Sequence, residues 1–448
     1  MTLDPQRRIL RDGSIAIDGS RIVEVGKTEV VKKNHPADRV IDAGGSVVMP
    51  GFVDCHAHVS AEPAVKGLTP DDTNHVSWVR DWIIKVHDVV TPDEEYATSL
   101  FTFVEMIKTG TTSFIEAGTV KAVDKAAQAM RDAGIRGSLG KFVWDIPKQP
   151  PSLAYSTEEG LKATEEAIRK YDGFAEGRVR VWATPLGHTA CTDQLLLGMK
   201  GLADKYGVGV TLHLSSWPED VEHYRKTTGD RPLVHLSKIG FLDTNVVVAH
   251  AVNVDSAEIE ALVKHDAKIA HCPPTALRFG YGITKVGMFP EMLEKGVCVG
   301  LGCDSATCSN YFDMGRVVYL AAGLYKDSRQ DISKVPAERA LEMGTINGAR
   351  ALGMEKEIGS LEKGKKGDLI VFDRSRPEWV PMFNVVNNIV YSADGKSVRT
   401  VVIDGNVVME DYKLTTLDEA KVYEGVQKAG EAIISRAGLP IKSRWPVS

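Results

Sequence analysis

The 448-residue chain lacks the sequence features typical of membrane-spanning, secreted and nucleic-acid-binding proteins. No run approaches the roughly 20 consecutive apolar residues that cross a bilayer. The first residues, Met1–Arg8, carry charge but no apolar stretch of the kind found in secretory signals. Lys and Arg number 54 against 60 Asp and Glu, so the formal charge is −6 and there is no basic excess for nucleic acid or an anionic membrane surface. We therefore expect a partner that is neither nucleic acid nor membrane.

Cysteine is also sparse. The chain has six cysteines and no Cys-x-x-Cys pair, and they are spread over positions 55, 191, 272, 298, 303 and 308. This distribution does not resemble a disulfide framework, so the sequence predicts a reducing, cytoplasmic location. Hydrophobic residues make up 43% and charged residues 25% of the chain, which is typical of a globular protein.

The two ends of the chain share one pattern. Residues 14–26 read as two short strands around Asp18-Gly19, and residues 398–409 repeat this design around Asp404-Gly405. Asp-Gly between alternating apolar residues is a strong hairpin signal, because a type I′ turn needs positive φ at both central positions. The pattern predicts one small β-sandwich built from both termini; two unrelated surface hairpins are the alternative.

Between the ends, apolar strand-like runs alternate with helical patterns. One helix is expected to begin at Thr91-Pro-Asp-Glu94, where Thr91 and Glu94 form a capping box, and to end near Gly110. The strand-like runs are 51–57, 111–118, 136–145, 179–186, 207–214, 245–252, 267–274 and 298–305.

This repetition predicts an α/β protein with a (β/α)₈ TIM barrel. We expect the barrel at 50–363 and the β-sandwich, with a C-terminal helix, at 1–49 and 364–448. The interval 60–90 is long for a loop and is expected to form a lid or pocket wall.

Four of the predicted strands end in side chains that bind metals. The first ends in His56-Ala-His58, the fifth in His213, the sixth in His250 and the eighth in Asp304. Residues i and i+2 of a strand point the same way, and parallel strands of a barrel end at one mouth. Each residue alone would more often be structural, but their shared placement predicts a metal site.

These residues also resemble a known family. The motif Pro50-Gly-Phe-Val-Asp-Cys-His-Ala-His58, followed by the three later strand-end residues, is similar to the amidohydrolase superfamily. The resemblance is greatest to its S-adenosylhomocysteine deaminase, guanine deaminase and triazine chlorohydrolase branch, and extends to phenylurea and thiocarbamate hydrolases. Further segments that carry it are Thr111-Thr112, 184–193, Pro290-Glu-Met-Leu, 299–304 and 358–370.

The resemblance implies roles for the strand-end residues. His56, His58, His213 and Asp304 would bind one divalent ion, and His250 and Asp304 would act on its water as catalytic residues. Imidazole and carboxylate ligands suit Zn²⁺, with Fe²⁺, Co²⁺ or Mn²⁺ as alternatives. A second ion is not expected, because the fourth strand ends without a carboxylate or lysine and Lys141 on the third is the only other candidate. Relatives of this kind are usually homo-oligomers, dimers or tetramers.

The chain departs from this branch at Ser216. Deaminases and chlorohydrolases of the branch carry Glu three residues after the fifth-strand His, where it protonates a ring nitrogen, and Ser cannot do this. Glu219 could replace it only if its loop folds back. The sequence therefore favours a metal-dependent amidohydrolase that cleaves a C–N bond of a small-molecule amide, urea or (thio)carbamate. The alternative is an aminohydrolase or dechlorinase acting on an aminopurine, pyrimidine or s-triazine; a barrel without catalysis is a third, less favoured hypothesis.

Other residues near the mouth are candidates for substrate binding. Ser216 itself belongs to this group. The others are Trp78 in the long interval after the first strand, His188 and His271 after the fourth and seventh strands, and Arg278 in the loop that follows the seventh. For His188, His271 and Arg278 a structural role is equally consistent with the sequence, and for Trp78 a core role is favoured.

Overall fold

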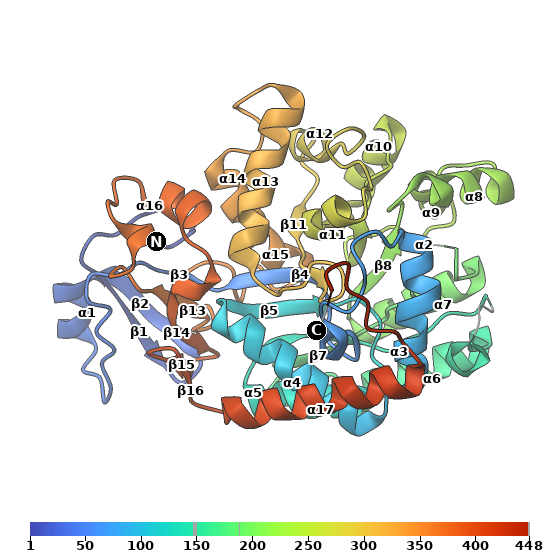
Figure 1. Ribbon diagram of the computed structural model, residues 1–448. Helices are drawn as coiled ribbons and strands as arrows, with labels where there is room; N and C mark the ends of the chain where they lie inside the picture. The colour runs from blue at the N-terminus through green and yellow to red at the C-terminus, as the bar shows by residue number, and fades with distance from the viewer. Residues whose placement is uncertain (147–149, 188, 447–448) are drawn as a thin grey trace.

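The alternation of strands and helices produces a closed parallel barrel. The computed structural model describes residues 1–146, 150–187 and 189–446. Strands β4–β7 pair in parallel as one sheet and β8–β11 as another; a bridge from Ala183 to Val210 joins them, and β11 lies against β4. In Figure 1 these strands lie at the centre with helices around them. The barrel strands are β4 (Phe52–His58), β5 (Thr111–Glu116), β6 (Arg136–Gly140), β7 (Val179–Trp182), β8 (Val210–Leu214), β9 (Val246–His250), β10 (Lys268–His271) and β11 (Val299–Leu301).

The two-residue strand β12 (Asp304–Ser305) follows β11 and pairs with the end of β4. The barrel strands occupy the predicted runs, which confirms the predicted TIM barrel. Helices cover the outside of the barrel, and the capping box of Thr91 and Glu94 at the start of α4 is present. These helices are α4 (Pro92–Lys108), α5 (Val123–Ala133), α6 (Thr157–Tyr171), α7 (Asp193–Tyr206), α8 (Pro218–Thr228), α9 (Pro232–Lys238), α10 (Ser256–His265), α11 (Pro273–Arg278), α12 (Phe289–Glu294), α13 (Met314–Arg329), α14 (Ala337–Met343) and α15 (Ile346–Ala351).

A second, antiparallel sheet joins the two ends of the chain. Its order is β16-β15-β14-β13-β3, so an N-terminal strand pairs with four C-terminal ones. The hairpin β1–β2 packs on it through Ile22, which contacts the cluster of Leu369, Val371 and Val402. Figure 1 shows the blue and red strands together at one side. The strands are β1 (Gly13–Asp18), β2 (Arg21–Lys27), β3 (Val48–Pro50), β13 (Leu369–Phe372), β14 (Val398–Ile403), β15 (Asn406–Glu410) and β16 (Lys413–Leu414).

A buried ion-pair group connects this sheet to the barrel. Arg136, the first residue of β6, places its Nε 3.0 Å from Oδ2 of Asp368 and its Nη2 3.0 Å from Oδ1 of Asp404. Burial opposes the charge, but the two carboxylates raise the pKa of Arg136 further above its usual value. The contact lies at the amino end of the barrel strands, away from the mouth.

The C-terminal helix α17 (Glu419–Ala437) lies on the barrel rather than on the terminal sheet. It packs against α3 (Ile84–Val89), α4 and η1 (Glu62–Val65), and runs along the barrel in Figure 1. We propose the domain limits 50–363 and 1–49 with 364–448; in this division α17 belongs to the terminal unit by sequence but contacts the barrel.

The interval after β4, for which the sequence predicted a lid or a pocket wall, folds into short helices at the mouth. It contains η1, α2 (His75–Trp78), η2 (Val79–Ile83) and α3, and its apolar side chains share a small core with Ile433 and Leu439 from the C-terminal end of the chain. The remaining short helices are α1 (Thr28–Asn34), η3 (Pro151–Leu153), η4 (Pro377–Trp379), α16 (Val385–Asn387), η5 (Asn388–Ser392) and η6 (Gly395–Ser397).

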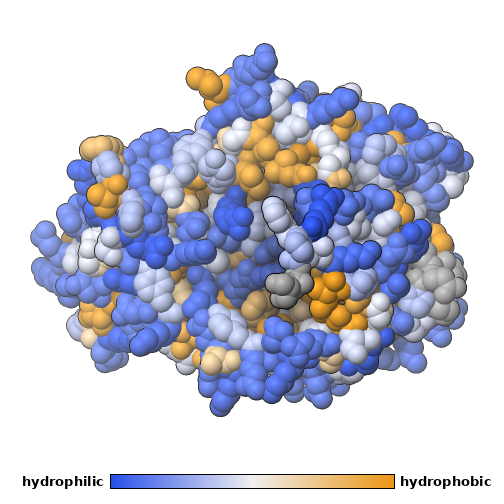
Figure 2. All heavy atoms as spheres, in the orientation of Figure 1, coloured by the Kyte–Doolittle hydropathy of each residue, from blue (hydrophilic) through white to orange (hydrophobic). Residues whose placement is uncertain are grey.

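Within the described ranges, none of the helices combines the length and the apolar character that crossing a membrane requires. The face in Figure 2 is mostly hydrophilic, with hydrophobic side chains in small separate groups.

Candidate metal centre

The strand-end residues predicted from the sequence meet at one mouth of the barrel. His56 and His58 are alternate residues of β4, His213 lies on β8, His250 ends β9 and Asp304 begins β12. All five are buried. Two overlapping groups, His56 with His58 and His213, and His56 with His250 and Asp304, each hold their ligand atoms within 4.8 Å of one another.

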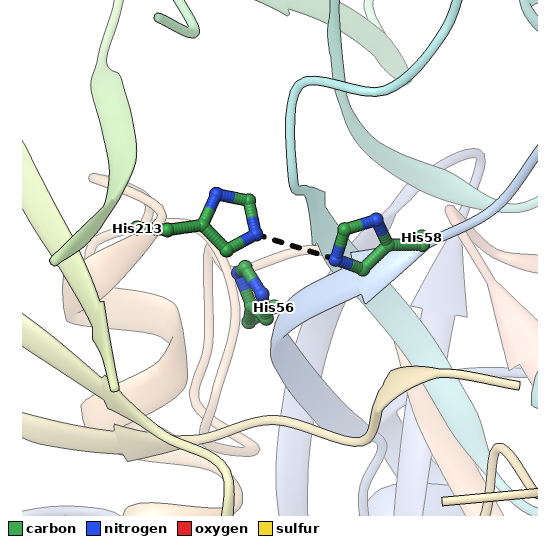
Figure 3. Close-up of side chains that lie close together, drawn as sticks. All are labelled: His56, His58 and His213. Atoms are coloured by element: carbon green, nitrogen blue, oxygen red, sulfur yellow. Dashed lines mark hydrogen bonds between the residues drawn. The ribbon is translucent and has the colours of Figure 1, made fainter. Parts of the chain in front are cut away.

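The separations leave room for a single ion at the centre of the group. Nε2 of His58 lies 3.3 Å from Nε2 of His213 and 3.2 Å from Oδ1 of Asp304. Nε2 of His56 is 3.7 Å from the same carboxylate oxygen. Figure 3 shows the rings of His58 and His213 turned toward one another, with His56 beside them. Three imidazoles and one carboxylate around one point are a donor set that fits Zn²⁺ or a similar divalent ion.

The tautomers of two imidazoles also suit metal binding. Nδ1 of His213 lies 2.8 Å from the carbonyl oxygen of Leu186, and Nδ1 of His58 lies 3.2 Å from Oε1 of Glu62. Because both neighbours only accept, each Nδ1 would carry the ring proton when an ion is bound, and each Nε2 would then present a lone pair to that ion. Outer partners of this kind orient metal-binding histidines in proteins.

Charges around the centre keep the Asp304 carboxylate ionised. Burial opposes its negative charge, but the hydrogen bond from His58 and the nearby His56 and His250 hold the pKa of Asp304 well below its usual value. Oδ2 of Asp304 lies 3.9 Å from Nε2 of His250. The carboxylate can therefore both bind a cation and accept a proton from a molecule held at the centre.

The backbone at the mouth is strained. His250, Asp304 and Ser215 have φ of 72°, 67° and 54°, in the left-handed region that non-glycine residues rarely adopt. Each such residue costs about 1–3 kcal/mol and persists where the surrounding structure enforces it, commonly at functional sites. Here the strained residues are His250 and Asp304, which belong to the predicted site, and Ser215, which lies two residues after His213.

Glu62 was missed by the sequence analysis, although it follows His58 by four residues. Its Oε1 lies 3.2 Å from Nδ1 of His58, an ion-pair contact, and accepts a hydrogen bond from Nε2 of His87, which is 3.1 Å away. Its Oε2 accepts from the hydroxyl groups of Ser305 and Thr307. Burial opposes its charge, but the positive charge of His58 beside it and the hydrogen bond from His87 lower the pKa of Glu62 well below its usual value. The signal in the sequence was an acidic residue one turn beyond a His-x-His motif.

Ser216 lies in a buried position beside a second carboxylate. Its backbone N–H donates to Oδ2 of Asp220 at 3.2 Å, and its carbonyl oxygen accepts from Asn253 at 3.1 Å. Asp220 is 2% exposed, on the first turn of α8, whereas Glu219 beside it points to solvent. The acid nearest to the position predicted for Glu is therefore Asp220 and not Glu219.

An aromatic wall lies next to the centre. Its members come from α2, from the residue before α8 and from the loop after α11, and they are His75, Trp78, Trp217, Phe279 and Tyr281. The rings of His75 and Trp217 are 3.9 Å apart, and the ring of Tyr281 is 6.2 Å from that of His250. Trp78 was predicted to line the pocket and is part of this wall.

The other predicted substrate contacts lie in different surroundings. The ring of His271 stacks on Phe289 at 3.7 Å, its Nε2 is 3.0 Å from the hydroxyl of Tyr325, and burial lowers its pKa to about 3. The guanidinium of Arg278 donates to the carbonyl oxygens of Thr307, Cys308 and Thr69. These partners favour a supporting role for both residues. His188 lies outside the described residues.

Comparisons with known proteins agree with this arrangement. The model of the amidohydrolase family matches residues 47–408. The chain is 34% identical over 436 residues to a 5'-deoxyadenosine deaminase of Methanosarcina mazei, with 97% of each chain covered. It is also 34% identical over 434 residues to a 5-methylthioadenosine/S-adenosylhomocysteine deaminase of Syntrophobacter fumaroxidans, covering 97% of this chain and 96% of the relative.

Solved structures show the same fold. A zinc-bound adenosine deaminase of Xanthomonas campestris aligns with a TM-score of 0.90 at 24% identity over 97% of both chains. A zinc-bound atrazine chlorohydrolase of Arthrobacter aurescens aligns with a TM-score of 0.87 at 22% identity, covering 96% of this chain and 97% of the other. With a family match over most of its length, and with the strand-end histidines and aspartate assembled at the mouth, the chain belongs to the amidohydrolase family and is a hydrolase of C–N bonds other than peptide bonds.

Proposed function

We propose that the protein is a metal-dependent aminohydrolase that removes the amino group from a nitrogen heterocycle, with an adenine-type nucleoside as substrate. The observation that carries this proposal is the similarity over nearly the whole chain to deaminases of adenosine derivatives. The aromatic wall supports it, because a flat heterocycle can stack on aromatic rings beside the metal centre. This substrate replaces the amide or urea that the sequence favoured.

In this proposal the residues at the mouth have separate roles in metal binding, proton transfer and stabilisation of the charged oxygen. His56, His58, His213 and Asp304 would hold one zinc ion, which lowers the pKa of a bound water toward ~7 and so supplies a nucleophile at neutral pH. Asp304 would accept a proton from the attacking water through its carboxylate and return one to the departing ammonia. His250, with Nε2 3.9 Å from Oδ2 of Asp304, donates a hydrogen bond to the oxygen that gains charge.

Deamination also needs a proton on the ring nitrogen, and we assign this role to Asp220. A carboxylic acid beside the ring is the usual means of removing the aromatic stabilisation of the heterocycle before water attacks. Ser216 provides none, but Asp220 is buried and holds the backbone N–H of Ser216. Asp220 is thus the carboxyl group closest to where Glu is expected.

Ser216 favours a second candidate function. An amide, urea or carbamate carbonyl is polarised directly by the metal and His250, so its hydrolysis needs no acid at the ring. If Asp220 does not face the substrate, no carboxylic acid is available to protonate a ring nitrogen, because Ser216 stands at that position. Carbonyl C–N hydrolysis is then the chemistry that the site supports.

The two candidates differ in their products. The zinc-loaded protein would be tested on 5'-deoxyadenosine, 5'-methylthioadenosine, an aminotriazine, an aryl amide and a phenylurea, with and without a chelator. The proposal expects about one ion per chain and chelator-sensitive release of ammonia from the nucleosides. Release of an aryl amine from the amide or urea without ammonia from any heterocycle would establish the second candidate. A loaded protein that releases neither product would overturn both.

Asp304→Asn is the matched control for this assay, because it keeps the size of the side chain while removing its capacity to accept a proton. We further propose a cytoplasmic location and a homo-oligomer, which size-exclusion chromatography with light scattering would test.

A further inference from the structure

Glu62 is the one buried acceptor in the described structure that contacts a metal-binding histidine and the segment after Asp304 at once. Oε1 accepts a hydrogen bond from His87 and lies 3.2 Å from Nδ1 of His58, and Oε2 accepts hydrogen bonds from the hydroxyl groups of Ser305 and Thr307. One carboxylate therefore contacts β4, α3 and the segment that begins at Asp304.

The position of the ring proton of His87 follows from its surroundings. In the described structure Nδ1 of His87 is buried and has no hydrogen-bond partner, whereas Nε2 lies 3.1 Å from Oε1 of Glu62. Because a carboxylate only accepts, Nε2 is the nitrogen that donates to Glu62. His87 thereby holds Oε1 in place, 3.2 Å from Nδ1 of His58.

We propose that Glu62 is a positioning residue that sets the affinity of the centre for its metal, with His87 as its support. It fixes His58 in the tautomer that presents Nε2 to the ion and makes that nitrogen a stronger donor. Through Ser305 and Thr307 it also fixes the segment that carries Asp304. One buried carboxylate thereby orients two of the four metal ligands.

Glu62 is in turn held from outside the barrel. It lies on η1, which packs against the C-terminal helix α17. The two backbones approach so closely at Gly430 that a Cβ atom there would lie 2.3 Å from the carbonyl oxygen of Ala64. Because real Cβ atoms essentially never come this close, the helix needs glycine at this point to let η1 reach its position.

The test measures metal affinity rather than turnover. Glu62→Gln removes the charge and keeps one acceptor oxygen, while Glu62→Leu removes both acceptors. Metal-free protein would be titrated with Zn²⁺ in competition with a chromophoric chelator, and with Co²⁺, whose visible absorption reports the ligand geometry. We expect Kd to rise about 10-fold for Glu62→Gln and about 100-fold for Glu62→Leu, the range found for outer-shell partners.

Glu95→Gln is the matched control. Glu95 is a buried carboxylate at the same mouth. It accepts hydrogen bonds from the hydroxyl of Ser60 and from the backbone N–H groups of Lys121 and Ala122, and none of these partners is a strand-end residue. Its variant should keep Kd within threefold of the parent. Circular dichroism would show which variants are folded; if Glu62→Leu does not fold, Glu62→Gln carries the test.

A folded Glu62→Gln or Glu62→Leu protein that binds Zn²⁺ within threefold of the parent would overturn the proposal. The proposal rests on the metal-dependent function proposed above, but the two can fail separately. Loss of affinity in these variants with no C–N hydrolysis by the parent would refute only the function. Ammonia release by the parent with unchanged affinity in the variants would refute only the role of Glu62.

Discussion

Asp220→Asn should slow deamination strongly while leaving the fold in place. General acid catalysis by a positioned side chain contributes typically ~10²- to 10⁴-fold. At about 1.36 kcal/mol for each factor of ten, this is about 2.7–5.4 kcal/mol of transition-state stabilisation. The oxygen of Asn can still accept the N–H of Ser216, which lies 3.2 Å from the present carboxylate. The loss of stability is therefore limited to about 1 kcal/mol, the difference between a charged and a neutral acceptor.

The assay is steady-state release of ammonia from 5'-deoxyadenosine by zinc-loaded protein, with the zinc content measured for each variant. We expect kcat to fall at least 100-fold while KM stays within threefold, because the proton is needed in the transition state and not for binding. Glu219→Gln is the matched control, since Glu219 is the neighbouring carboxylate but points to solvent. It should keep kcat within twofold.

A second variant separates catalysis from structure. Adding Ser216→Glu to Asp220→Asn places a carboxyl group three residues after His213 and should recover at least tenfold of the lost rate. If Asp220→Asn keeps kcat within threefold of the parent, Asp220 is not the acid. If it loses activity and zinc together, the residue supports the fold of the mouth and the assignment to catalysis is refuted.

Two further predictions concern stability. Arg136→Met should lower the free energy of unfolding by about 3–5 kcal/mol, because it removes the guanidinium that pairs with the buried Asp368, whereas Asp404 keeps Lys366 as a partner; urea unfolding measures this, and a change below 1 kcal/mol would refute it. Burial raises the pKa of Asp313 to about 6, above its usual 3.8, so the carboxyl favours folding below pH 4 and this contribution is lost as the pH rises through 6. Asp313→Asn should therefore gain about 2 kcal/mol relative to the parent between pH 4.5 and 7, and a difference that does not change with pH would contradict this.

The architecture could be read from the sequence because its signals are local. Strand-like runs ending in His213 and His250 alternate with capped helices, and Asp-Gly turns mark the terminal hairpins. The strand-end residues could also be placed together, since parallel strands of a barrel end at one mouth and His56 and His58 share a face. Both inferences need only the end of each strand at which a residue lies and the face to which its side chain points, and both can be read from the sequence.

The contacts around the centre could not be predicted, because they join segments far apart in the chain. His87 meets Glu62 across 25 residues, and Ser305 meets it across 243. Arg278 was predicted to bind substrate, but its guanidinium donates hydrogen bonds to the carbonyl oxygens of three residues distant in the sequence. The burial of Asp220 beside the exposed Glu219 depends on how α8 turns against the barrel, which no local pattern records. The C-terminal helix was grouped with the terminal sheet for the same reason.

The wall that follows β4 joins the two halves of the site. Its first helix, η1, brings Glu62 to the metal-binding His58, and α2 brings His75 and Trp78 to the aromatic wall. The last part, α3, supplies His87. A substitution that shifts this segment should therefore change metal affinity and substrate preference together, whereas one on α8 should change substrate chemistry alone. If both proposals hold, the barrel strands fix where the ion is held, and the segment between β4 and α4 determines how tightly it is held and which ring lies beside it.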